Sequence, residues 1–112
     1  MSYKVETYRP GTDIKAETYR PGTDIVVLDF PLDPPSLEFL QRQVGGYIQV
    51  PPSLPGMRPR VKCYCDEDGL LKRLPSNTLA THRAIELGYN ITHPLVGNVV
   101  FVEEVKDDSS QI

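Results

Sequence analysis

The sequence predicts an α+β domain, in which a small and mostly antiparallel sheet carries one or two helices on one face. Three observations predict this fold class. Short segments typical of β-strands recur between turn residues along the chain. Eleven prolines among 112 residues interrupt the chain too often for long helices. Two stretches, residues 37–44 and 78–87, nevertheless place apolar side chains on one side of a helix and end at glycine.

Length and composition are those of a single globular domain. Hydrophobic residues make up 39% of the chain and charged residues 24%, which argues against disorder of the whole chain. The formal net charge of −3 provides no overall field to attract nucleic acid, so we expect no nucleic-acid partner. The apolar runs are far too short to cross a bilayer, and no signal peptide is recognisable. We therefore expect a cytoplasmic protein in a reducing compartment, without membrane contact.

The chain opens with a tandem repeat, in which residues 4–14 recur as residues 15–25 and only Val5 is replaced, by Ala16. This near-identity suggests a recent tandem duplication. Each copy predicts a short strand followed by an Arg-Pro-Gly-Thr turn, because proline presets φ and glycine tolerates a positive φ. Strands are then expected at residues 4–8, 13–19 and 25–30, which turns of this length would join into a meander.

The alternative, which we favour, treats the first copy as surplus. Val5 and Ala16 offer little apolar surface, and terminal segments with little to bury stay loose. Residues 1–14 would then be loose or add as an edge strand. The α+β domain would span residues 15–104, and residues 105–112 would form a polar tail.

The middle of the chain predicts a helix and a strand. Ser36 is a candidate N-cap, and the Gly45-Gly46 pair ends the helix that follows it. Residues 47–50 predict a strand, and residues 51–59 form a proline-rich loop.

The C-terminal half predicts two or three further strands. Residues 61–65 form one, with Val61, Cys63 and Cys65 on one face. A turn at 66–69 leads to a short strand at 70–74, and residues 98–103 form the last strand. Between them a helix over 78–87 ends at Gly88, with Leu79, Ile85 and Leu87 on its apolar side. A ferredoxin-like split βαβ arrangement of these elements is also conceivable.

Several segments together resemble a known family. They are Pro21-Gly22, residues 36–41, the Val-Gly-Gly-Tyr-Ile run at 44–48, residues 66–77 with their Leu-Pro-x-Asn ending, and residues 96–100. Over residues 15–103 the chain resembles the domain of unknown function 3846 family. The resemblance implies a small domain found in bacteria, phages, other mobile elements, algae and large viruses, and it brings no activity or catalytic residues. The duplicated N-terminal unit, the loop at 51–59 and the Cys-Tyr-Cys strand depart from the family pattern.

We expect a purely structural role for the motif residues that bend the chain. Gly45-Gly46 lets the chain leave a helix and enter a strand at once. Pro75 fixes a bend, and the side chain of Asn77 caps the next helix. The full set is Gly45, Gly46, Gly69, Leu74, Pro75, Asn77 and Gly97.

The candidate metal ligands are Cys63, Cys65, His82 and His93. Zinc favours four ligands, and paired cysteines in zinc sites are usually separated by two to four residues, whereas one residue separates this pair. Buried free cysteines behave as small apolar residues, so we expect both in the core and no metal or other cofactor. A cysteine nucleophile would need a histidine within hydrogen-bond reach, and nothing nearby in the sequence supplies one, so we expect no enzyme.

The leading functional hypothesis is a non-enzymatic interaction or accessory module, which binds itself or another protein through exposed strand-edge material at the N-terminus, in residues 4–14. The alternative is a regulatory or counter-defence factor of viral or mobile-element type that binds a nucleotide or another small ligand. That alternative rests on the distribution that the resemblance implies. Its candidate ligand-binding residues are Tyr64, Asn77 and His82.

Overall fold

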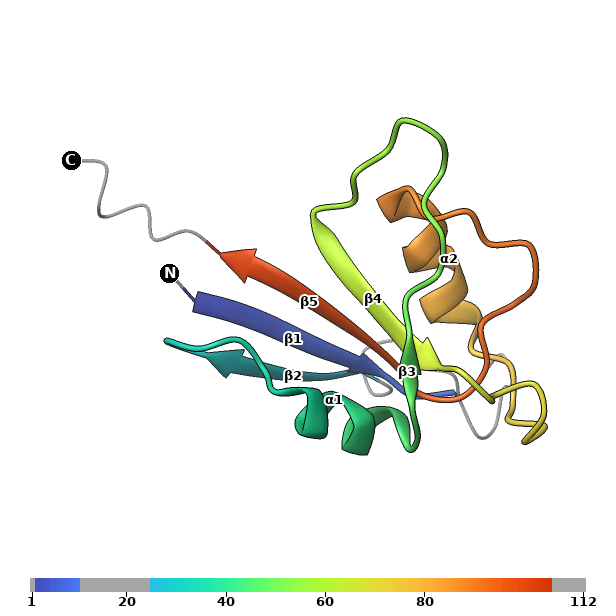
Figure 1. Ribbon diagram of the computed structural model, residues 1–112, viewed down its shortest axis with the longest axis horizontal. Coiled ribbons are helices and arrows are strands. Elements are labelled where there is room, and N and C mark those ends of the chain that lie inside the picture. Colours follow the sequence, from blue (N-terminus) through green and yellow to red (C-terminus); the bar gives the residue numbers. More distant parts are fainter. Residues whose placement is uncertain (1, 11–24, 106–112) are drawn as a thin grey trace, which may run out of the picture.

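The computed structural model describes residues 2–10 and 25–105 of the chain. They form a five-stranded antiparallel sheet with the strand order β2-β1-β5-β4-β3 and two helices (Figure 1). The elements are β1 (Ser2–Tyr8), β2 (Ile25–Phe30), α1 (Leu37–Val44), β3 (Ile48–Gln49), β4 (Val61–Asp66), α2 (Thr78–Leu87) and β5 (Val99–Val105). The predicted α+β class is confirmed.

The strand of the first copy, β1, lies in the interior of the sheet, beside the central strand β5. β1 pairs with β2 on one side and with β5 on the other, and Val5 faces Leu28 and Val102. The expectation that this copy is loose or forms an edge strand is therefore wrong for residues 2–8. Val5 is fully buried, and the ring of Tyr8 packs edge-on against Phe101 with 4.9 Å between ring centroids. The tyrosine supplies the apolar surface that the valine alone does not. The strand expected at 13–19 lies outside the described residues.

The two helices lie on opposite faces of the sheet, which corrects the expectation of helices on one face. On one side α1 covers a cluster of Val5, Leu40, Val44, Val100 and Val102. On the other side α2 contributes to a cluster of Tyr8, Val61, Cys63, Cys65, Ala80, Ala84, Tyr89, Val99 and Phe101. Successive β5 side chains alternate between these clusters, and residues 99–102 are all apolar because that strand is buried on both faces.

Both helices begin and end where the sequence indicates. The Ser36 hydroxyl accepts a hydrogen bond from the Phe39 N–H at 3.1 Å, and Gly45 ends α1 in the left-handed conformation with φ 90°. Asn77 caps α2, and Gly88 ends it with φ 103°. The buried face of α2 differs from the prediction, because Ala80 and Ala84 face the sheet while Ile85 is 49% exposed.

Two predicted strands differ in the structure. The strand expected at 47–50 is reduced to the two residues of β3. The strand expected at 70–74 is wrong, because this segment forms consecutive turns closed by local main-chain bonds, Lys72 N to Asp68 O at 2.9 Å and Leu74 N to Gly69 O at 3.1 Å. The ferredoxin-like arrangement is also not formed. Instead, α1 connects the two edge strands β2 and β3, and α2 connects the neighbouring strands β4 and β5.

Candidate functional site

The motif residues of the sequence meet at the end of the sheet where β1 and β4 end and β5 begins. Glycine is required at two of these places by close packing. A Cβ on Gly97 would lie 2.6 Å from a Leu74 methyl group, and one on Gly69 would lie 2.7 Å from a Val96 methyl group. The Gly97 N–H also donates to the carbonyl of Pro75 at 2.8 Å. These residues therefore hold the connections of the sheet in place.

Asn77 lies at the centre of this end of the sheet and is only 2% exposed. Its side-chain Nδ2 donates to the main-chain carbonyls of Tyr8 at 2.9 Å and Gly97 at 2.8 Å. Its Oδ1 accepts from the Ala80 N–H at 3.2 Å and so caps α2. Every polar atom of the side chain is engaged, and both hydrogens of the amide are used by the chain itself.

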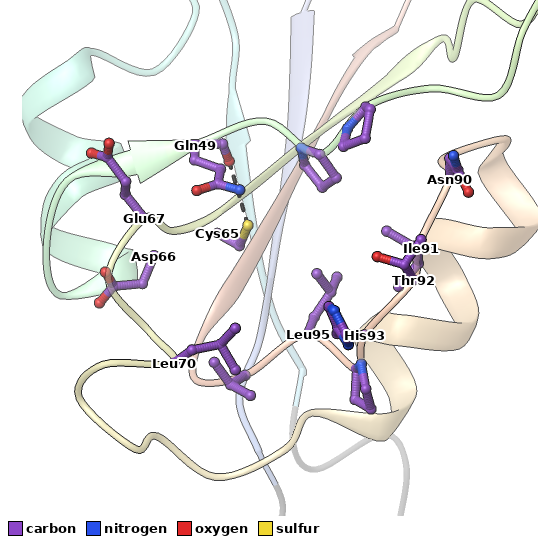
Figure 2. A pocket seen from close by; sticks show the side chains of 14 residues that line it. Gln49, Cys65, Asp66, Glu67, Leu70, Asn90, Ile91, Thr92, His93 and Leu95 are labelled. Atoms are coloured by element: carbon purple, nitrogen blue, oxygen red, sulfur yellow. Dashed lines mark hydrogen bonds between the residues drawn. The ribbon is translucent and has the colours of Figure 1, made fainter.

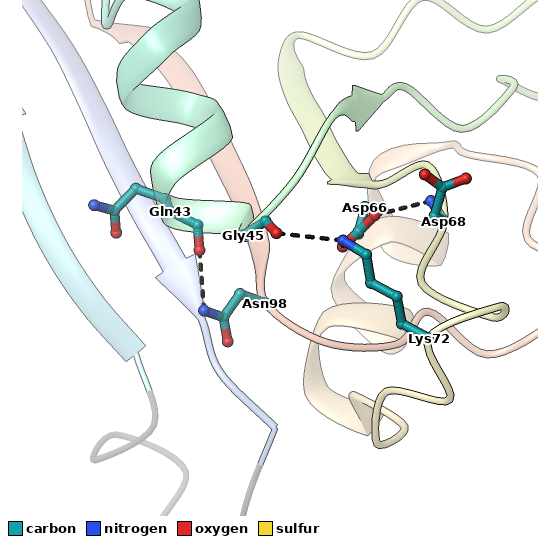
Figure 3. A network of polar contacts seen from close by, with 6 residues as sticks. All are labelled: Gln43, Gly45, Asp66, Asp68, Lys72 and Asn98. Atoms are coloured by element: carbon teal, nitrogen blue, oxygen red, sulfur yellow. Dashed lines mark hydrogen bonds and ion pairs between the residues drawn. The ribbon is translucent and has the colours of Figure 1, made fainter.

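A second polar network joins the end of α1 to the turn after β4 (Figure 3). Lys72 Nζ lies 2.7 Å from Asp66 Oδ2 and also donates to the Gly45 carbonyl at 3.3 Å. Asp66 Oδ1 accepts from the Asp68 N–H at 2.8 Å. A Cβ on Gly46 would come within 2.6 Å of the same Lys72 nitrogen, so glycine leaves room for the ion pair.

The candidate ligand-binding residues do not converge. Tyr64 packs on the α1 side of the sheet, Asn77 is buried at the start of α2, and His82 is exposed on α2. The sequence offered these three residues as candidates for binding one ligand. The structure separates them, because Tyr64 points to the opposite face of β4 from the α2 cluster.

Both cysteines lie in the α2 cluster on the same face of β4. Burial raises the pKa of the Cys65 thiol to about 11 and raises the pKa of Cys63 further above its ordinary value. Cys65 Sγ donates to the Gln49 carbonyl at 3.5 Å. Across residues 2–10 and 25–105, no three metal-ligating side chains come together, and His82 and His93 lie apart on α2 and on the loop after it.

A pocket of about 170 Å³ lies between the end of β4 and the loop that follows α2 (Figure 2). Figure 2 shows Gln49 and Glu67 on one side of it and Asn90, Thr92 and His93 on the other. Its complete lining is Gln49, Pro51, Pro52, Cys65, Asp66, Glu67, Leu70, Asn90, Ile91, Thr92, His93, Pro94, Leu95 and Val96. His93 and Cys65 are the only sequence candidates in this lining. The pocket walls come from segments far apart in the chain, so no local sequence pattern indicated it.

The sheet has one closed edge, formed by β3 and β4. β3 pairs with β4 only at Asp66 and Cys65. Nearer the start of β4 the Tyr89 hydroxyl donates to the Val61 carbonyl at 2.7 Å and accepts from the Cys63 N–H at 3.0 Å. One side chain thus satisfies the main-chain groups that a neighbouring strand would otherwise bind. The proline-rich loop joins this cover, since Leu54 N donates to the Gly88 carbonyl at 2.9 Å.

The opposite edge of the sheet is β2, and it differs in every respect. All six of its residues pair with β1 on the inner side, and no other strand of the described ranges pairs with its outer side. Val27 is 49% exposed and Leu28 is 42% exposed, on opposite faces of the strand. The only charged residue of β2 is Asp29, which lies opposite Lys4 of β1. A six-residue apolar edge of this kind readily pairs with another strand.

Comparison with known proteins gives one result. The family model described as domain of unknown function (DUF3846) matches residues 14–112, most of the chain. No curated protein and no solved structure matches it. In the described part of the chain, no helix has the length and apolar character needed to span a membrane.

Proposed function

The chain belongs to the domain of unknown function DUF3846 family, and from this premise we propose that it is a non-enzymatic interaction module that pairs the outer edge of β2 with a β-strand of another chain. The observation that carries the proposal is the contrast between the two edges of one sheet. The Tyr89 hydroxyl and the proline-rich loop cover the β3–β4 edge, whereas β2 presents six residues of main chain with exposed Val27 and Leu28.

Strand addition of this kind uses the main chain for affinity and the alternating side chains for specificity. Val27 and Leu28 would bury their exposed area on the two faces of the extended sheet. The edge lacks the lysines and prolines with which natural edge strands usually prevent pairing, since Pro31 follows only after the strand has ended.

The partner that suits this edge is a second copy of the chain. Antiparallel pairing about a two-fold axis keeps the α1 faces of both sheets on the same side. An axis at Val27 places Asp29 opposite Ile25 of the other copy, and an axis at Leu28 places it opposite Val27. Neither register sets two carboxylates against each other, so the edge is complementary to itself.

Hydrogen exchange of the full chain at low and high protein concentration tests this role. We expect the amides of Ile25–Phe30 to exchange more slowly at high concentration, while β4, in the closed half of the sheet, stays unchanged. Equal exchange of β2 at all concentrations would contradict self-pairing.

We propose a small polar ligand in the pocket of Figure 2 as a second candidate function. Its support is the mixed lining, with the imidazole of His93, the amide of Asn90 and the hydroxyl of Thr92 facing apolar groups. At about 170 Å³ the pocket suits a ligand of few atoms or one part of a nucleotide. Thermal unfolding of the full chain with a panel of nucleotides, phosphates and amino acids tests it. A shift abolished in His93→Ala but kept in His82→Ala would support binding here, and no shift across the panel would oppose it.

A further inference from the structure

We propose that the interior β1 position accepts either copy of the repeat, so that residues 15–19 can replace residues 4–8 between β2 and β5. The position is defined by its two neighbouring strands. β2 pairs with all of residues 3–8 on one side, and β5 pairs with all of residues 2–8 on the other. The sequence supplies two segments that meet its requirements, and the sheet formed by residues 2–10 and 25–105 has one such position.

Several of the contacts that hold β1 come from residues that both copies share. Lys4 lies opposite Asp29 and Glu103, and the Thr7 hydroxyl donates to Gln43 Oε1 at 3.3 Å. Lys15 and Thr18 are the same residue types at the corresponding places of the second copy.

The last residue of the strand is also shared. The Tyr8 ring packs on Phe101, and Asn77 binds the Tyr8 main-chain carbonyl. Tyr19 carries the same ring and the same carbonyl, so either copy satisfies this end of the sheet.

The copies differ at three positions of the strand. Asp13 would stand in place of Ser2, Ile14 in place of Tyr3, which packs against the α1 cluster, and Ala16 in place of Val5. The family match begins at residue 14. The family match therefore includes residues 15–19 of the second copy, from the residue that would take the place of Tyr3 onward, and leaves out residues 4–8 of the first copy. In the structure the first copy holds the β1 position.

Two opposing effects keep the two arrangements close in free energy. With the first copy in place, sixteen residues (9–24) connect Tyr8 to Ile25, whereas with the second copy five residues (20–24) connect Tyr19 to Ile25. The shorter loop favours the second copy about sixfold. The two carbons that valine has beyond alanine favour the first copy, roughly fifteenfold from their transfer out of water. Of these two effects the buried valine is the larger, in agreement with the place of the first copy in the structure, and Val5→Ala removes it.

Hydrogen exchange of the full-length variant Val5→Ala/Ala16→Val, which has the same composition as the native chain, tests directly whether one copy can replace the other. Both effects then favour the second copy, so we expect strand-like protection to move from residues 4–8 to residues 15–19. Peptides that contain residues 1–3 report on the first copy, because these residues precede that copy alone. Protection that stays on residues 4–8 would overturn the proposal.

Charge substitutions provide a second test, because each one prevents one copy from occupying the β1 position. Val5→Asp expels the first copy, and we expect the chain to stay folded with a lowered Tm, because the second copy takes its place. Ala16→Asp should leave Tm unchanged. The double variant should lose cooperative unfolding. A Val5→Asp chain as unfolded as the double variant would contradict the proposal.

Discussion

The side-chain amide of Asn77 donates a hydrogen bond to the main-chain carbonyl of Tyr8 at 2.9 Å, across 69 residues of sequence. A second bond to the Gly97 carbonyl and a cap on the Ala80 N–H make this one side chain a junction of β1, β5 and α2. Both acceptors of the amide are main-chain oxygens, so these hydrogen bonds depend on where the backbone lies and are independent of the side chains at the two acceptor residues.

Replacing Asn77 should therefore cost more than an ordinary helix cap. Asn77→Ala leaves two buried carbonyls without donors and removes the cap, and we expect a loss of about 3 kcal/mol in the free energy of unfolding. Asn77→Asp keeps the cap acceptor but loses the donors, so it should be at least as damaging. Urea denaturation measures both, with Asn90→Ala, at an exposed position, as the control. A small loss of stability in Asn77→Asp would show that only the helix cap matters and would contradict the role of the two donated hydrogen bonds.

Gly46 and Lys72 should act as one unit. Lys72→Met leaves the Asp66 carboxylate buried without its cation, and we expect a loss of about 2 kcal/mol. Gly46→Ala displaces the same ammonium group, which is the end of a flexible side chain, and should cost less than the loss of the lysine. Because both changes break one ion pair, the double variant should be little less stable than the worse single variant. Additive losses in urea denaturation would mean that the glycine serves another purpose.

The thiols should be unreactive in the folded chain at neutral pH. The pKa of Cys65 is raised to about 11 in the folded state, above about 8.5 in an unfolded chain. The stabilising contribution of the neutral thiol is thus fully present below pH ~8.5 and is lost as pH rises through about 11. Burial raises the pKa of Tyr8, Tyr64 and Tyr89 with the same sign.

Comparison of the native chain with Cys65→Ala isolates the contribution of this thiol to the pH dependence of stability. The variant should lose less stability than the native chain between pH 9 and pH 11. Rapid modification of native Cys65 by a thiol reagent at pH 7.5, faster than unfolding, would contradict its burial.

The sequence predicts local features of this fold well because they are encoded locally. Ser36, Gly45, Asn77 and Gly88 bound the two helices, since caps and left-handed glycines act within one turn. The alternation in residues 61–65 likewise placed both cysteines on one face.

Features that depend on distant partners escaped prediction. β1, the strand of the first copy, is an interior strand because β5, almost a hundred residues later, pairs with it. The pocket and the position of β2 at the edge of the described sheet likewise follow from strand order, which no local pattern contains. One usable signal was the run Val99–Val102, apolar at every position, which is typical of a strand covered on both faces.

The most direct test of the proposed edge pairing is the mass of the full chain in solution, measured by sedimentation equilibrium for the native chain and two variants. Val27→Lys places a charge on the β2 edge, and Ile85→Lys places one on α2 at a side chain of equal exposure, 49%. We expect the native chain and Ile85→Lys to form dimers as concentration rises and Val27→Lys to remain a monomer. A native chain that stays monomeric, or a Val27→Lys variant that dimerises as strongly as Ile85→Lys, would contradict pairing through β2.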